Sequence, residues 1–293
     1  MRQNEVKGAQ MVKVVVTGAH SGIGQDLIKS VCEKGVEVLA LITPWAKQDG
    51  LYQKDGSVIY IPCDLQKTVP ADIVDQCKDA EILVHLAWAR PKDVSKATSD
   101  NLDLYQNLTT ALPDDIKTVF MSSVCATDVN PSYYGQAKFA LAQKMDRSRT
   151  VEIIAGLVMS EPAMGPYLAL QNFVCKLHGA FKFLPSPMAV VADADQVMQA
   201  LEKSVLDFDN CPRLVAAYRP EAVRLNDLIV DILKVKKVSG LPIPVPNGLT
   251  VAMLYLVRKL VPSMSIADRL ITLLTVSPEA VEKRVVLENK DGA

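Results

Sequence analysis

A glycine-rich turn between a predicted strand and a predicted helix is the feature that most restricts the fold of this chain. The valine-rich run 11–16 predicts a β-strand, and the amphipathic segment 23–33 predicts a helix. Between them stands Thr17-Gly18-Ala19-His20-Ser21-Gly22-Ile23-Gly24. Strand, tight turn and helix in this order are typical of a turn that binds the pyrophosphate of a dinucleotide.

The three glycines of this turn have different physical tasks. Gly18 frees the backbone for the turn, Gly22 removes a side chain where a phosphate would lie, and Gly24 lets the helix pack close to the strand. The amino terminus of the helix then faces an anion. The residues of this segment that we expect to contact a dinucleotide are Thr17, Gly18, His20, Ser21, Gly22, Ile23 and Gly24.

A tyrosine and a lysine four residues apart, Tyr134 and Lys138, would lie on one face of a predicted helix. A free tyrosine has a pKa of about 10, and a nearby cation favours the phenolate. Lys138 is therefore expected to lower the pKa of Tyr134. Ser123 follows the apolar run 118–121, which places its hydroxyl at the carboxyl end of a strand, where open α/β sheets bind ligands. We predict that Ser123, Tyr134 and Lys138 are catalytic.

With these motifs the chain resembles the short-chain dehydrogenase/reductase superfamily, and more narrowly its extended NAD-dependent epimerase/dehydratase-like branch, over about residues 11–200. The resemblance implies an acidic residue near the adenine, an apolar strand end beside the cofactor, and an asparagine that positions rather than transfers a proton. The further cofactor-binding residues implied in this way are Asp64, Leu65, Leu86, Ala87, Trp88, Asn101, Gly156 and Val158, together with Tyr134 and Lys138.

The chain also departs from the pattern of that branch. Trp88 stands where a small residue is expected, and the arginine of the usual Arg-Pro-Gly turn after strand 151–154 is missing. Ser123 and Tyr134 are close in sequence, which indicates a shorter substrate loop. Val124-Cys125 follows the strand-end serine in place of an Asp-Glu pair, so dehydration is not expected, and Cys125 is interpreted as a small buried residue.

Cofactor choice depends on the segment after the second predicted strand, 36–42. An acid there would accept from the ribose hydroxyls, and a base would accommodate a 2′-phosphate. The segment reads Thr43-Pro44-Trp45-Ala46-Lys47 and contains no acid. We therefore expect NADP or NAD with a preference for NADP, and Lys47, with His20, beside the 2′-phosphate.

Composition and patterning favour an α/β protein, a Rossmann-type doubly wound parallel sheet with a smaller C-terminal substrate lobe. We expect a disordered extension at residues 1–10, a dinucleotide-binding domain at 11–157 and, mainly in 158–293, the substrate lobe, with some elements returning to the sheet. A net charge of −1 argues against a nucleic-acid partner. Six cysteines without a Cys-x-x-Cys pair and three scattered histidines indicate no metal site and a reducing, cytoplasmic location.

The C-terminal third combines a proline-rich segment, 240–246, with an apolar helix expected at 249–257 and interrupted by Arg258-Lys259. It is too short to span a bilayer. It either packs as a cap over the substrate cleft or makes a weak membrane-surface contact, and the apolar run 270–274 is compatible with both. Upstream, Asp193 or Asp195 is expected to cap a helix. By analogy with such folds, a homodimer is expected.

The motifs together predict an NAD(P)-dependent oxidoreductase that interconverts a ketone and a secondary alcohol. By family resemblance, the small-molecule substrate would be a 4-keto sugar nucleotide. One alternative is an NAD-dependent nucleotide-sugar epimerase, which would retain its cofactor. Another is a non-catalytic protein that senses NAD(P) or serves as a scaffold.

Overall fold

The computed structural model describes residues 12–47, 49–54, 56–179, 181–261, 263 and 265–290. The extension expected to be disordered, residues 1–10, lies outside the described residues, as does Met11.

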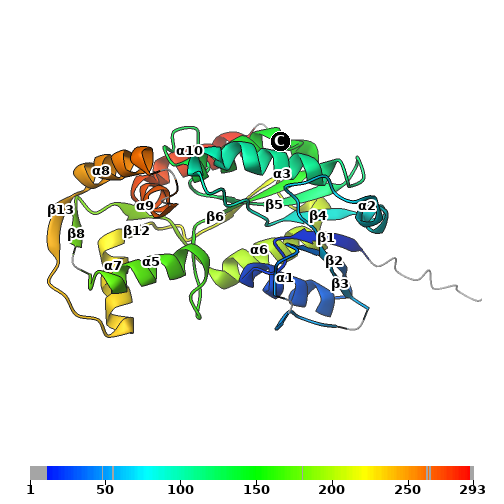
Figure 1. Ribbon diagram of the computed structural model, residues 1–293, viewed down its shortest axis with the longest axis horizontal. Helices are drawn as coiled ribbons and strands as arrows, with labels where there is room; N and C mark the ends of the chain where they lie inside the picture. Colours follow the sequence, from blue (N-terminus) through cyan, green and yellow to red (C-terminus); the bar gives the residue numbers. More distant parts are fainter. Residues whose placement is uncertain are drawn as a thin grey trace, which may run out of the picture.

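A parallel sheet of seven strands, in the order β11-β6-β5-β4-β1-β2-β3, forms the centre of the molecule (Figure 1). Its strands are β1 (Lys13–Thr17), β2 (Glu37–Ile42), β3 (Val58–Pro62), β4 (Ile82–His85), β5 (Lys117–Ser123), β6 (Thr150–Ala155) and β11 (Leu214–Ala217). The central strands are continuous apolar runs because helices cover both faces of the sheet. The predicted Rossmann-type fold is confirmed.

Two layers of helices enclose the sheet (Figure 1). On one face lie α1 (Gly22–Glu33) and α6 (Ala194–Leu206), whose apolar stripes share a core with the strands. On the other face lie α2 (Ala71–Cys77), α3 (Ala97–Thr109) and α4 (Tyr133–Lys144). Each fully buried leucine or isoleucine of these stripes stabilises the fold by roughly 1.5–3 kcal/mol.

The order of the strands reverses beside β1. The chain runs outward from β1 to β2 and β3, then returns to the other side of β1 with β4, β5 and β6. The carboxyl ends of β1 and β4 therefore diverge into a crevice, and in open α/β sheets that crevice is where ligands bind. The turn after β1 and the Leu86–Trp88 segment after β4 both lie at this edge.

A smaller lobe lies beside the carboxyl end of the sheet, at the left of Figure 1. Its core gathers buried side chains of α5 and α7 and of the short strands, with α8 and α9 packed against them. The helices are α5 (Gly165–Lys176), α7 (Leu225–Lys236), α8 (Asn247–Leu260) and α9 (Ser265–Thr275). The strands pair as β10 (Val191–Asp193) with β7 (Leu157–Met159), β12 (Val223–Arg224) with β9 (Met188–Ala189), and β13 (Ile243–Pro246) with β8 (Phe181–Leu184).

Two local expectations for this part of the chain need correction. Asp193 is the N-cap residue of α6, as predicted, but its side chain makes no capping hydrogen bond; both carboxylate oxygens accept from Arg219 instead, at 2.6 and 3.0 Å. The apolar helix in the C-terminal third is not interrupted at Arg258-Lys259, and α8 continues to Leu260. No helix in the described part of the chain is long and apolar enough to cross a membrane.

The last helix, α10 (Pro278–Lys290), returns to the sheet and is held there by a buried ion pair. Arg284 donates two hydrogen bonds to Glu152 of β6, at 2.7 and 2.8 Å, and a third to the carbonyl of Ala126 at 2.5 Å. Neither side chain of the pair is more than 7% exposed, so loss of either partner would leave a buried charge without its counter-ion.

Candidate functional site

The glycine-rich turn after β1 has the backbone that its sequence predicts. Gly18 has a φ of +68°, and a Cβ at this position would lie 2.8 Å from the carbonyl carbon of Leu86. A Cβ at Gly24 would meet the carbonyl oxygen of Gly18 at 2.7 Å. The side chain of Ser21 caps α1 by accepting from the amide of Gly24 at 3.1 Å. These contacts require glycine at both positions and point the start of α1 toward the crevice.

Thr17 joins the ends of β1 and β4. Its hydroxyl lies 3.0 Å from Nδ1 of His85 and accepts from the amide of Ala87 at 3.2 Å. His85 is fully buried, and desolvation, with a smaller effect from Lys138, lowers its pKa to about 3. The imidazole is therefore neutral at physiological pH and serves as a fixed hydrogen-bonding wall of the crevice.

Asn101 of α3 holds the segment that follows β4. Its amide side chain accepts from the backbone amide of Ala89 at 2.8 Å and donates to the carbonyls of Ala89 and Ala97. The side chain is buried, so these bonds fix the path of the backbone beside Trp88. Asn107, farther along α3, instead donates to the carbonyl of Leu65 at 3.2 Å.

Ser123 and Tyr134 meet where β5 ends. The hydroxyl of Ser123 lies close enough to Tyr134 to lower its pKa, and the thiol of Cys125 donates to Oγ of Ser123 at 3.0 Å. Cys125 is buried, and desolvation raises its pKa to about 11, so it is a protonated neighbour and not a nucleophile at neutral pH. The geometry gives one hydroxyl pair at the edge of the sheet where a carbonyl oxygen of a substrate could be bound.

Lys138 lies one helical turn beyond Tyr134 and is 5% exposed. Its ammonium group donates to the carbonyl of Met121 at 2.8 Å and lies 4.8 Å from the ring centres of both Trp88 and Phe120. Desolvation lowers the pKa of Lys138 to about 8, while Cys125 and Glu152 oppose this effect.

The expectation that Lys138 lowers the pKa of Tyr134 is wrong for this state of the protein. Burial raises the pKa of Tyr134, and Cys125 adds to the increase. The hydrogen bond with Ser123 and the charge of Arg90 act in the opposite direction but do not outweigh burial. At neutral pH the phenol is therefore protonated and able to donate a proton.

Trp88, the departure from a small residue, lies between the two catalytic candidates of α4. Its ring meets that of Tyr134 edge-on, with centroids 4.8 Å apart, and its face lies under the ammonium of Lys138. The indole therefore covers part of both groups and contributes to their burial.

The beginning of α4 is held by a carboxylate from α9 that the sequence did not reveal. Asp268 accepts from the backbone amides of Tyr133 and Tyr134, at 2.9 and 3.1 Å. Ser132 caps the next amide, that of Gly135, at 3.0 Å. Three amides that have no partner within the helix are thus paired, and a negative charge stands at the positive end of the helix dipole.

Arg258 of α8 completes this contact. Its guanidinium donates to Asp268 at 2.9 Å and to the carbonyl of Pro131 at 3.0 Å, and it lies 4.1 Å from the ring centre of Tyr133. Both side chains of the pair are nearly buried. Residues of α8 and α9, more than a hundred positions along the chain from α4, therefore hold the start of the helix that carries Tyr134.

The remaining predicted residues lie in different surroundings. Lys47 and His20 are exposed on the surface, and Asp64 pairs with Lys67 at 3.4 Å. Leu65 is buried in the core beneath α2 and α3. Gly156 and Val158 lie where the chain crosses to the smaller lobe, and a Cβ at Gly156 would meet the backbone of Val191 at 2.7 Å.

The residues present fit a dinucleotide, with one side chain that must move. Gly18, Gly24 and the capped start of α1 leave bare backbone at the switch point of the sheet. At Gly22 the sulfur of Met164 occupies the position of a Cβ. Methionine has three rotatable bonds, so this thioether can turn away from the phosphate position at little cost.

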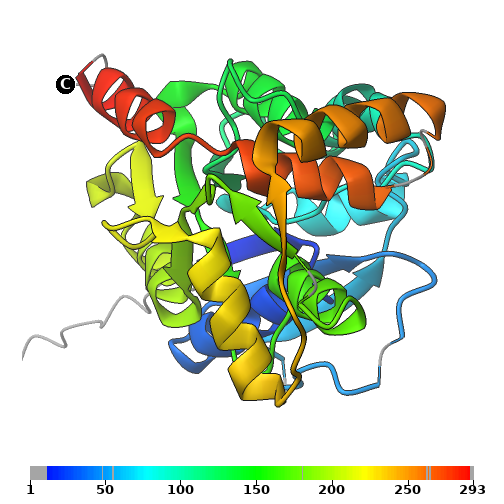
Figure 2. The ribbon, with the colours of Figure 1, turned by 90° about the vertical axis from the view of Figure 1, so that its left-hand side faces the viewer.

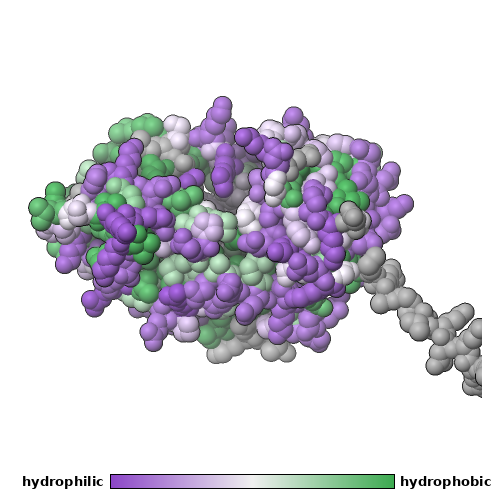
Figure 3. Space-filling model, turned by 90° about the horizontal axis from the view of Figure 1, so that it is seen from below, coloured by the Kyte–Doolittle hydropathy of each residue, from purple (hydrophilic) through white to green (hydrophobic). Residues whose placement is uncertain are grey.

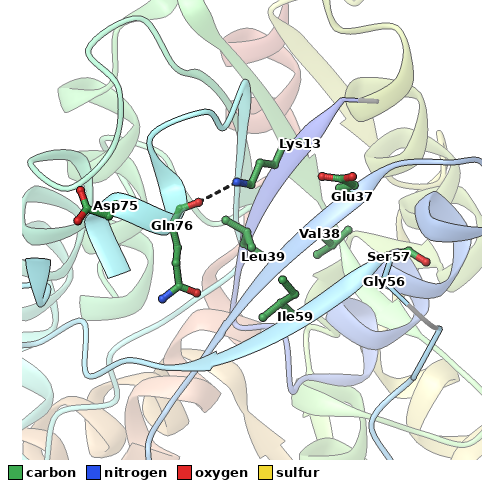
Figure 4. A pocket seen from close by; sticks show the side chains of 9 residues that line it. All are labelled: Lys13, Glu37, Val38, Leu39, Gly56, Ser57, Ile59, Asp75 and Gln76. Carbon is green, nitrogen blue, oxygen red and sulfur yellow. Dashed lines mark hydrogen bonds between the residues drawn. The ribbon is translucent and has the colours of Figure 1, made fainter. Parts of the chain in front are cut away.

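A pocket of about 190 Å³ lies at the opposite edge of the sheet (Figure 4). It is lined by residues at the amino ends of β1, β2 and β3 and by Gln76, whose carbonyl accepts from Lys13 at 2.9 Å. None of the predicted site residues lines it.

Several solved structures have the same fold. WbmG of Bordetella bronchiseptica, in complex with NAD and UDP, has a TM-score of 0.62 at 17% identity, over 81% of this chain and 83% of its own. UDP-glucose 4-epimerase of Thermotoga maritima, with UDP-glucose, has a TM-score of 0.57 at 14% identity, over 80% and 86%.

The terminal R domain of the myxalamid biosynthetic pathway has a TM-score of 0.64 at 12% identity, over 92% of this chain and 80% of its own. This chain has the fold of the nucleotide-sugar epimerases. The predicted resemblance is thereby confirmed for the fold. No protein-family model matches the sequence, and no curated protein does.

We predict that Asp268→Asn lowers the free energy of unfolding by about 2 kcal/mol, because charge-assisted hydrogen bonds to two amides and to Arg258 are weakened. Urea unfolding measures this change. Asp72→Asn is the matched control, since Asp72 lies in the first turn of α2 but on the surface. Equal losses in the two variants would contradict the role of Asp268.

We also predict that Lys138→Met stabilises the protein at pH 7 by roughly 1–3 kcal/mol. The folded pKa of about 8 lies below the ordinary 10.5, so the unfolded chain binds the proton more tightly and the wild type gains stability as the pH rises between these values. The advantage of the variant should shrink over the same interval. Lys144→Met, on the exposed end of α4, should leave stability unchanged at every pH.

Proposed function

We propose that this chain is an NAD(P)-dependent oxidoreductase that interconverts a ketone and a secondary alcohol. The observation that carries the proposal is the buried cluster at the carboxyl end of β5, where the ring of Trp88 contacts both Tyr134 and the ammonium of Lys138, and where Ser123 adjoins Tyr134. A neutral donor pair and a cation, held in a crevice beside a glycine-rich turn, suit reduction of a carbonyl group.

Each residue has a distinct task in the proposed reaction. The nicotinamide cofactor, when bound, supplies or accepts the hydride. Ser123 donates a hydrogen bond to the carbonyl oxygen of the substrate, and Tyr134 gives its proton to that oxygen as negative charge develops there. Lys138, one helical turn along α4, would hold the ribose of the cofactor beside Tyr134. Asp268 and Asn101 keep the two sides of the crevice in place.

Burial raises the pKa of Tyr134, so the phenol holds its proton at neutral pH, which is the form that gives a proton to a carbonyl oxygen during reduction. A 4-keto sugar nucleotide is the substrate class that we propose, since WbmG is described with UDP and NAD, and the Thermotoga epimerase with UDP-glucose. Homodimer formation and a cytoplasmic location remain predictions from the sequence.

A nucleotide-sugar epimerase is the second candidate, favoured by the fold shared with UDP-glucose 4-epimerase. It would keep its cofactor through oxidation and re-reduction of one sugar. Mass spectrometry of the denatured protein distinguishes the two, because tightly carried NAD supports the epimerase and exchangeable NADPH supports the reductase. Failure to bind either cofactor would contradict both and support a scaffold role.

Tyr134→Phe should reduce turnover by at least about a hundredfold, because the transferred proton is lost, while cofactor affinity stays unchanged. Turnover of a 4-keto sugar nucleotide and fluorescence titration of the reduced cofactor measure the two quantities. The neighbouring Tyr133→Phe is the control: it keeps the ring beneath Arg258 and should retain activity. Full activity of the Tyr134 variant would refute the mechanism.

The cofactor-free protein should bind NADPH more tightly than NADH. Lys47 is exposed after β2 in a segment without an acidic residue, so Lys47→Ala should weaken NADPH binding by roughly two- to fivefold and leave NADH binding unchanged. Lys29→Ala, an exposed lysine on α1, serves as the control. An equal effect on both cofactors would show that Lys47 does not contact the 2′-phosphate.

A further inference from the structure

The outer face of α8 is apolar and exposed. Leu249, Met253, Leu256 and Leu260 are 58%, 60%, 58% and 70% exposed. Their spacing of four, three and four residues places them on one side of the helix. Val251 and Leu254, on the inner side, pack against the core of the smaller lobe. The helix is therefore anchored by one face and presents a second apolar face outward.

The neighbouring strand extends this surface. Leu241 is 90% exposed and Ile243 of β13 is 63% exposed, and the paired strand β8 adds Leu184. Seen from below, apolar side chains gather at the left-hand end of the molecule (Figure 3), where Figure 1 places β8 and β13. A group of exposed apolar side chains of this kind is typical of a binding face, whereas single exposed leucines are ordinary.

The same part of the chain is strongly basic. Residues 232–267 contain no aspartate or glutamate but five basic residues, although the whole chain has a net charge of −1. These are Lys234, Lys236, Lys237, Arg258 and Lys259. Lys234 pairs with Asp231 at 3.5 Å and Arg258 with Asp268, so two of the five charges are compensated.

The other charges are available on the surface. Within the described ranges, no ion pair forms at Lys236, Lys237, Lys259 or Lys182, the last of which lies on β8 opposite Pro244. Figure 2 shows the loop and β13 running from the carboxyl end of α7 to α8, so Lys236 and Lys237 lie at the far end of this segment from α8. Lys259 is next to Leu260 on α8, and Lys182 is on β8 together with Leu184. The exposed apolar residues of α8 and β8 thus each have a lysine on the same element.

We propose that α8 and the loop before it lie in the interface of a membrane that contains anionic lipids. The exposed leucines and Met253 enter the boundary between headgroups and acyl chains, and the lysines on the same elements contact lipid phosphates. A second copy of this chain fits less well, because a symmetric contact would bring like charges together at Lys259 and its neighbours. The helix is too short to cross the bilayer, so it binds parallel to the surface.

Vesicle co-sedimentation with the full chain tests this proposal. Wild-type protein should sediment with vesicles of equal parts phosphatidylcholine and phosphatidylglycerol, and much less with phosphatidylcholine alone. Leu256→Glu should abolish sedimentation. Lys259→Gln should weaken it by roughly fivefold, and added salt should weaken it further. Leu206→Glu, an exposed leucine at the end of α6, is the matched control and should bind like the wild type.

The proposal is overturned if the wild-type protein does not sediment with anionic vesicles at low salt. It is equally overturned if the Leu256→Glu variant binds these vesicles as tightly as the Leu206→Glu variant does. It is also overturned if the free protein is a dimer that Leu256→Glu dissociates, because α8 would then face a second copy. None of these results depends on turnover, so failure here leaves the proposed enzymatic function untouched.

Discussion

The close approach of two strand ends, those of β1 and β4, is the constraint on which the rest of this structure depends. Gly18 lies so near the backbone of Leu86 that a Cβ at its position would be only 2.8 Å away. This contact and the hydrogen bonds of Thr17 to His85 and Ala87 fix the position of the glycine-rich turn relative to the segment that follows β4. The strand order reverses here, so the segments that follow β1 and β4 form the two walls of the crevice in which a ligand would bind.

Buried polar groups at the crevice are satisfied by partners from distant parts of the chain. Lys138 is held by a strand carbonyl and two aromatic rings, and the amides that begin α4 are held by Asp268. Burial raises the pKa of Tyr134 and lowers that of Lys138, so both side chains are driven toward their neutral forms. Burying these two ionisable side chains therefore lowers the stability of the fold at the residues that we propose to be catalytic.

Sequence reasoning predicted what is encoded locally. The turn, the strand-end Ser123 and the Tyr134–Lys138 spacing each lie within a few residues, so a pattern reveals them, and the alternation of strands and helices predicted the sheet. Contacts between distant segments left no such pattern. Asp268 stands in an ordinary helix, and Met164 in a loop, yet both reach the site. Asp193 has the position of a cap, but Arg219, far along the chain, binds it instead.

The two sides of α8 are expected to tolerate substitution differently. Arg258 points inward to Asp268 and the loop before α4, so a change there would disturb the start of the helix that carries Tyr134. Leu256, only two positions earlier, faces outward and is exposed to solvent. Substitutions on the outer face of α8 could therefore change what this face binds without disturbing the residues around Tyr134. Evolution could then move the protein to a different cellular surface by changing one helix, while the site stays the same.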